Sequence, residues 1–169
     1  MENGGVEANF LAYAARRMKM SQGDIRRCAE QLSEEQMWQR GGEHENSVIN
    51  LLLHLAGNIR QWVLHGIDGQ PDVRERDEEF TLAKTLDAAE ARRQFDGTVD
   101  EAVEVIAGLA PGRLAEVIDP QPTGGYRDPT ILEAIFKVVG HLEMHTGQII
   151  LLTKQMVGKD LDLSLPRKR

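Results

Sequence analysis

The chain has 169 residues, of which 41% are hydrophobic and 28% are charged, and its formal net charge is −7. This length and composition are typical of one globular domain that buries its core without disulfides or a structural metal. We expect that domain over residues 1–160, followed by a tail over residues 161–169. The negative charge argues against a nucleic-acid partner, because binding to the phosphate backbone needs clustered Lys and Arg. We interpret the one basic cluster, residues 166–169, as a solvated terminus.

Cys28 is the single cysteine, so a disulfide within the chain is impossible and a reducing compartment fits the sequence. A nucleophilic role is conceivable, but we interpret Cys28 as structural because it lies in a helical stretch with Ala29. The first residues lack a signal-peptide pattern, and the longest apolar runs are far shorter than a membrane span. We therefore expect a soluble, cytoplasmic protein with no membrane partner.

Helical spacing of apolar residues predicts a first helix over residues 6–32. Ser33 and Gln36 then have the spacing of a capping box, which predicts a short helix through Trp38. The next apolar stretch predicts a second helix over residues 47–65, with Asn46 as its N-cap and Gly66 as its end.

A polar segment over residues 66–84 predicts a long crossover loop with room for one helical turn, and we interpret its charge run, residues 74–79, as a solvated face. The third helix is expected over residues 86–109 with Thr85 as its cap, followed by a helical turn over 114–117 and a loop over 119–127. Asp128 is expected to cap the fourth helix, with Pro129 at its first position.

The fourth helix should end at Val157, because Gly158 follows. Alternating β-branched segments are nearly absent, so we expect no strands. Four main helices with a long connection between the second and the third predict an all-α fold, a four-helix bundle with a crossover.

Three of the five histidines are expected to meet inside this fold. His141 and His145 are four residues apart, so they share one face of the fourth helix, and that face continues through apolar residues. His54 lies in the most apolar part of the second helix. Burying an unpaired polar group costs about 1–3 kcal/mol, and a divalent metal removes this cost by taking the ring nitrogens as ligands. Three imidazoles leave coordination positions open, as in catalytic rather than structural sites.

Simpler interpretations compete with a metal site. His54 alone favours a hydrogen-bonded core histidine, and the pair on the fourth helix alone is evenly balanced between packing and metal binding. The three together, on helices expected to be neighbours, favour metal. His65 lies roughly 16 Å along the helix from His54 and more simply caps the helix end, while His44 is expected in a loop.

Two stretches carry a resemblance to a known family. They are residues 46–58, which include Leu53-His54-Leu55-Ala56-Gly57-Asn58, and residues 141–149, His-Leu-Glu-Met-His-Thr-Gly-Gln-Ile. In these motifs and in helix order, the chain resembles the DinB-like (damage-inducible) superfamily of proposed metalloenzymes. The resemblance implies an up-down-down-up four-helix bundle, often a homodimer, that holds a divalent transition metal such as nickel or zinc through His54, His141 and His145.

Characterised members of that superfamily include transferases and isomerases that use low-molecular-weight thiols such as bacillithiol or mycothiol. We therefore expect a metal-dependent enzyme, a thiol transferase or a hydrolase, that acts on a small electrophilic molecule. The alternative is a non-catalytic, dimeric stress-response protein that binds a metal or a small molecule. The catalytic residues are not identified by the sequence. Asn58, Gln61 and Gln148 are candidates for orienting a ligand or substrate, and each could equally be an interhelical hydrogen bonder.

Overall fold

The computed structural model describes residues 5–81, 84, 86–118 and 128–163, and within these ranges the protein is all-helical. The expected all-α class is therefore confirmed, and the described residues hold just one isolated bridge, between Val117 and Thr130. Its elements are α1 (Val6–Ala29), α2 (Glu34–Trp38), α3 (Val48–Ile59), η1 (Arg60–His65), η2 (Arg76–Phe80), α4 (Ala88–Gly108), η3 (Pro111–Arg113) and α5 (Ile131–Val157). The expected cap Thr85, the loop over 119–127 and the basic cluster at 166–169 lie outside the described residues.

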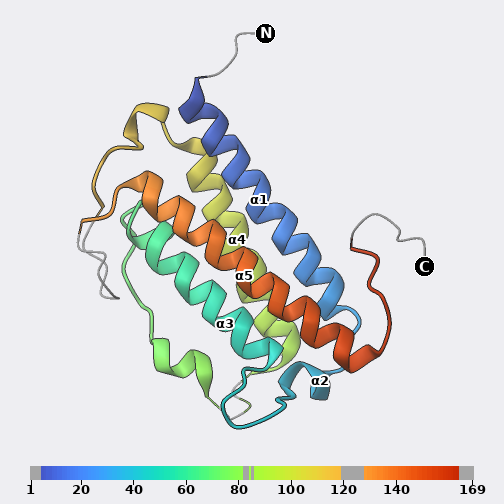
Figure 1. The fold of residues 1–169 in the computed structure, drawn as a ribbon. Helices are drawn as coiled ribbons and strands as arrows, with labels where there is room; N and C mark the ends of the chain where they lie inside the picture. The colour runs from blue at the N-terminus through green and yellow to red at the C-terminus, as the bar shows by residue number, and fades with distance from the viewer. Residues whose placement is uncertain (1–4, 82–83, 85, 119–127, 164–169) are drawn as a thin grey trace.

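The long helices pack pairwise around a common core (Figure 1). α1 packs against both α4 and α5, and α3 packs against the same two helices. The core is aliphatic, with Phe95 and Trp62 as its largest fully buried side chains. Trp38 is also buried, so both tryptophans belong to the interior of the chain. No helix in the described part of the chain is long and apolar enough to cross a membrane.

Side-chain caps fix where the helices begin. The predicted capping box of α2 is confirmed, since the Ser33 hydroxyl accepts from the backbone NH of Gln36 and the Gln36 side chain accepts from the Ser33 NH. The prediction of Asn46 as the cap of α3 was wrong by one residue. Ser47 is the cap, because it forms a reciprocal pair of hydrogen bonds with Asn50.

The predicted start of α5 was wrong by two residues. Asp128 and Pro129 precede the helix, and Thr130 caps it by forming a capping box with Glu133. The predicted end is confirmed, since Gly158 adopts a left-handed φ of 66° and its NH bonds the carbonyl of Lys154. The reciprocal box satisfies two backbone NH groups, which the predicted Asp128 cap would not.

The other helix ends also differ from the prediction. α1 ends at Ala29 rather than at residue 32, and α4 begins at Ala88 under an Asp87 cap. The short turn after α4 lies at Pro111–Arg113 rather than at residues 114–117, because Pro111 provides the fixed φ that starts such a turn. The segment that follows α5 contacts α1, because Arg27 donates to the carbonyls of Leu161 and Asp162.

The second predicted helix has two parts. It is α-helical to Ile59 and then widens into the π-helix η1, which ends at His65. The crossover that follows contains one helical turn, η2, as expected. The prediction that its charge run is solvated was wrong for Arg74 and Glu79, whose side chains are 4% and 8% exposed. Their burial has a cause, because they form an ion pair with each other at the histidine cluster.

Candidate metal centre

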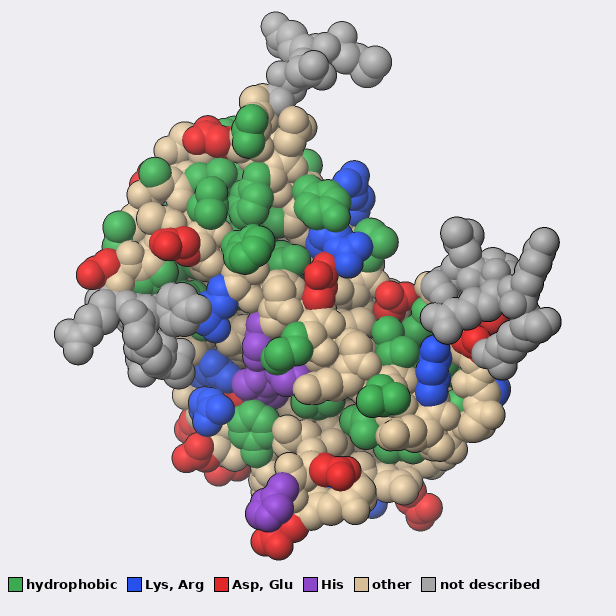
Figure 2. Space-filling model, viewed as in Figure 1, with side chains coloured by type: hydrophobic (Ala, Val, Ile, Leu, Met, Phe, Trp, Pro, Cys, Tyr) green, Lys and Arg blue, Asp and Glu red, His purple; other side chains and the backbone are tan. Residues whose placement is uncertain are grey.

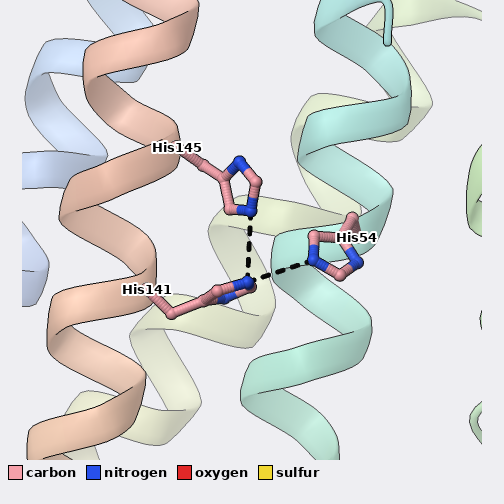
Figure 3. Close-up of side chains that lie close together, drawn as sticks. All are labelled: His54, His141 and His145. Atoms are coloured by element: carbon pink, nitrogen blue, oxygen red, sulfur yellow. Dashed lines mark hydrogen bonds between the residues drawn. The ribbon is translucent and has the colours of Figure 1, made fainter. Parts of the chain in front are cut away.

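Three histidine rings converge between α3 and α5 (Figure 3). His54 comes from α3, and His141 and His145 come from successive turns of α5. The Nε2 atom of His141 lies 3.1 Å from the Nε2 of His54 and 3.1 Å from the Nε2 of His145. One nitrogen from each ring lies within 4.8 Å of the others, so the cluster could hold a metal ion. The three predicted ligands are thus brought together.

The separations of the His141 nitrogen from the other two fit ligation of one ion. Two nitrogens bound at about 2.0–2.1 Å from a metal, at right angles or at the tetrahedral angle, lie about 2.8–3.4 Å apart. Both measured separations, 3.1 Å, fall in this range. With two ligands one helical turn apart and a third from the facing helix, the described residues leave other coordination positions without a protein ligand.

The cluster is buried on one side and open on the other. His54 and His145 are each 8% exposed, whereas His141 is partly exposed. Figure 2 shows histidine side chains reaching the surface near the middle of this face, with apolar side chains and Lys and Arg side chains around them. The ring of Phe80, from the crossover, lies against His54 with centroids 4.9 Å apart. One ring of the cluster is therefore partly open to solvent.

Hydrogen bonds on the far side of two rings determine where their protons are. The Nδ1 of His54 lies 2.8 Å from a carboxylate oxygen of Glu79, and the Nδ1 of His145 lies 2.7 Å from Oε1 of Gln148. Both partners accept, so in the neutral rings the proton lies on Nδ1 and Nε2 presents a lone pair toward His141. A protonated Nε2 on His141 could donate to one of these lone pairs and not to both.

Among the described residues, His141 has no such partner, because its Nδ1 is buried without a hydrogen bond to any of them. Burial and the nearby His145, His54 and Lys137 lower its pKa to about 3. Burial also lowers the pKa of His145, against the opposing effect of its hydrogen bond to Gln148. Neutral imidazole is the form that binds a metal, and a cation is the partner that accepts all the converging lone pairs at once.

Glu79 and Arg74 are parts of the site that the sequence prediction missed. Arg74 donates from Nε to one oxygen of Glu79 at 2.6 Å and from Nη2 to the other at 2.8 Å. Burial acts to raise the pKa of Glu79, but hydrogen bonds from Arg74 and His54 outweigh it, so the pKa is lowered and the carboxylate is ionised. No periodic pattern marks these residues, because Arg74 lies in the crossover and Glu79 on the single short turn η2.

The three polar candidates, Asn58, Gln61 and Gln148, occupy different positions relative to the histidines. Gln148 contacts a proposed ligand directly, through Nδ1 of His145. Gln61 is one step further out, since its Oε1 accepts from Arg74 at 2.8 Å. Asn58 is buried, and its Oδ1 has no hydrogen-bond partner among the described residues, the histidines included.

The remaining two histidines lie apart from the cluster. The Nδ1 of His65 lies 2.6 Å from the carbonyl of Gln70, so His65 holds the turn that follows η1. His44 is exposed in the loop before α3, as expected, and lines a groove that also reaches Gln148.

The comparisons with known proteins give a family without an assigned activity. A family model described as "Protein of unknown function (DUF1572)" matches residues 5–169. The chain belongs to this family. No curated protein matches the chain. The function of this DUF1572 member therefore has to be argued from its histidine cluster, and the likeness to the DinB-like superfamily stays an inference from the two motifs.

Proposed function

We propose that this protein binds one divalent transition metal, nickel or zinc, through the Nε2 atoms of His54, His141 and His145. The observation that carries the proposal is the convergence of three imidazole nitrogens whose protons are held on the opposite side of two rings. A hydrogen-bonded core histidine would need a partner for each ring nitrogen, and the Nδ1 of His141 has none in the described part of the chain.

We further propose that the centre is catalytic rather than structural. When bound, such a metal lowers the pKa of a thiol or a water in its open position and so provides a nucleophile at neutral pH. The residues of the chain hold the rings in place from behind, through Glu79 on His54 and Gln148 on His145. The partial exposure of His141 gives a substrate access.

The reaction class that we propose to test first is transfer of a low-molecular-weight thiol to a small electrophile. In this reaction the thiol loses its proton, its sulfur forms a bond to an electrophilic carbon, and the leaving group departs with the bonding electrons and is protonated. The support is the resemblance of residues 46–58 and 141–149 to the DinB-like superfamily. Hydrolysis, with water in place of the thiol, uses the same open position.

The same resemblance supports a proposal for the fold. We propose one domain over residues 1–160, an up-down-down-up four-helix bundle made of α1, α3, α4 and α5. In Figure 1, α1 and α5 run in one direction and α3 and α4 in the other. The pairwise packing of α1 and α3 against α4 and α5 also favours this arrangement.

We also propose that the protein is a homodimer through the face shared by α1 and α5. A groove of about 460 Å³ between these helices is lined by Phe10, Tyr13, Phe136 and Val139. Phe136 is 72% exposed and Tyr13 is 53% exposed. Aromatic side chains are enriched at protein interfaces, and an isologous contact would place the same groove of two copies face to face.

The decisive experiment measures metal content by mass spectrometry on tag-free protein. We expect near-stoichiometric nickel or zinc in the wild type and its loss in a His54→Ala, His141→Ala double variant. Absence of metal from both proteins after attempted reconstitution would overturn the proposal. A screen of thiols and electrophiles on the metal-loaded protein then tests the reaction class, with the double variant as the inactive control.

A further inference from the structure

We propose that Glu79, on η2 of the crossover, is the positioning residue that holds His54 with its proton on Nδ1 and its Nε2 free for the metal. This inference rests on the proposed metal site. It adds that a residue of the crossover, 25 positions after His54 in the chain, supports this ligand by a hydrogen bond on the side of the ring away from the metal.

The carboxylate of Glu79 is held at both oxygens. Arg74 donates to Oε1 from Nε and to Oε2 from Nη2, and the second oxygen also accepts from Nδ1 of His54 at 2.8 Å. Such paired, charge-assisted hydrogen bonds are shorter and stronger than neutral ones and fix the plane of the carboxylate. Arg74 is itself held by Gln61, so the arrangement has three successive supports behind one ligand.

Hydrogen bonds hold the backbone at the end of η2 to the start of α3 and to the segment before it. The side-chain amide of Asn50 donates to the carbonyls of Glu79 and Thr81, and Arg40 donates to the carbonyls of Phe80 and Thr81. Both ends of the Glu79 side chain are therefore fixed, which distinguishes it from a loop carboxylate that meets a histidine by chance.

Gly57 provides the space that the carboxylate occupies. A Cβ atom built at Gly57 would lie 2.0 Å from Oε1 of Glu79 and 3.1 Å from Nε of Arg74. Any larger residue at this position would push Glu79 away from its place. Gly57 is one helical turn after His54, so the gap opens beside the ligand that the carboxylate supports.

One competing arrangement has to be excluded. Nη2 of Arg74 lies 3.4 Å from Nδ1 of His54, so Nδ1 could instead accept from Arg74 and leave the proton on Nε2, where it would block the metal. The shorter contact, 2.8 Å, is the one to the Glu79 carboxylate, and Nη2 of Arg74 already donates to that carboxylate at 2.8 Å. Both distances favour the proton on Nδ1.

The first test compares metal affinities by competition with a chelator. We expect Glu79→Ala to weaken binding of zinc about 10–100-fold, as is usual for loss of a partner behind a metal-bound histidine. Glu78→Ala is the matched control, because Glu78 is the preceding acidic residue on η2 and is exposed. Thermal melts followed by circular dichroism serve to check that each variant is folded. A Glu79→Ala variant that is folded and binds as tightly as Glu78→Ala would overturn the inference.

The second test displaces Glu79 without removing it. We expect Gly57→Ala to weaken zinc binding in the same direction, whereas Gly23→Ala, in an open position of α1, leaves it unchanged. In a Glu79→Ala background the collision no longer exists, so adding Gly57→Ala should cause no further loss of affinity. If Gly57→Ala weakens zinc binding by the same factor with and without the Glu79 side chain, the effect of Gly57 does not act through Glu79.

The third test needs no metal. Nitrogen-15 NMR of the metal-free protein assigns the proton on the His54 ring, and we expect it on Nδ1 in the wild type and redistributed in Glu79→Ala. A His54 proton on Nε2 in the wild type would overturn the inference even if metal binds. If the wild type binds no metal, the proposed function fails. The NMR measurement still decides whether Glu79 determines which nitrogen of the His54 ring carries the proton.

Discussion

The three proposed ligands differ in what holds each ring. His54 has an ionised carboxylate behind it, His145 has a neutral amide, and the Nδ1 of His141 has no hydrogen bond to the residues that the structure describes. Charge-assisted hydrogen bonds are roughly twice as strong as neutral ones. The ligands are therefore not equivalent, and substitutions behind them should have graded effects on metal affinity.

Gln148→Ala should weaken zinc binding less than Glu79→Ala does, to about the tenfold end of the usual range. The reason is that Gln148 offers His145 one neutral acceptor and is itself exposed. The same chelator competition measures it, with Gln155→Ala, an exposed glutamine two turns along α5, as the control. A loss larger than that of Glu79→Ala would show that the amide, and not the carboxylate, dominates.

Cys28 should be inert to thiol reagents in the folded protein. It is fully buried, and burial raises the pKa of its thiol above the ordinary value, against a smaller opposing hydrogen bond with Thr153. At neutral pH the thiol is therefore protonated and inaccessible, so reaction with a disulfide reagent should follow unfolding. Stopped-flow absorbance with and without denaturant checks this. Rapid, stoichiometric reaction of the native protein would contradict it.

At the scale of elements, apolar periodicity predicts the helices well, but neighbouring polar residues compete for their ends. Asn46 and Ser47 are both acceptable caps, as are Asp128 and Thr130, and the reciprocal bond three residues later decides each case. Periodicity also places His54, His141 and His145 on facing stripes. It cannot place Glu79, because η2 is too short to show a periodic pattern and its partner His54 lies 25 residues away in the chain. Tertiary packing, and not local pattern, buries that carboxylate.

Thr130→Ala should lower the free energy of unfolding by about 1 kcal/mol, since it removes the capping hydroxyl of α5. Asp128→Ala should change it by less than about 0.5 kcal/mol, because Asp128 is an exposed residue ahead of the helix. Urea unfolding followed by circular dichroism measures both. The opposite ranking would mean that α5 begins at Asp128 in solution.

At the scale of the whole molecule, the proposed dimer depends on the α1–α5 face. Phe136→Glu should convert a dimer into a monomer, because dimerisation would bury a charge that lines the groove. Leu151→Glu is a control on the same helix, exposed but away from that groove. Light scattering during size-exclusion chromatography gives the mass. A wild type that is monomeric at all concentrations would contradict the dimer.

Metal should stabilise the whole molecule without being needed for its fold. The core is formed by residues of all four long helices, and the histidines lie at its edge, so the metal-free protein should be folded.

A ligand that binds the native state alone adds about 2.7 kcal/mol to the free energy of unfolding at 100 times its Kd. For a chain of this size, that raises the Tm by about 5–11 °C. Scanning calorimetry with and without zinc checks this, and His54→Ala should be folded without showing the rise. An unfolded metal-free protein or His54→Ala variant would instead indicate a structural metal, and the catalytic proposal would then fail.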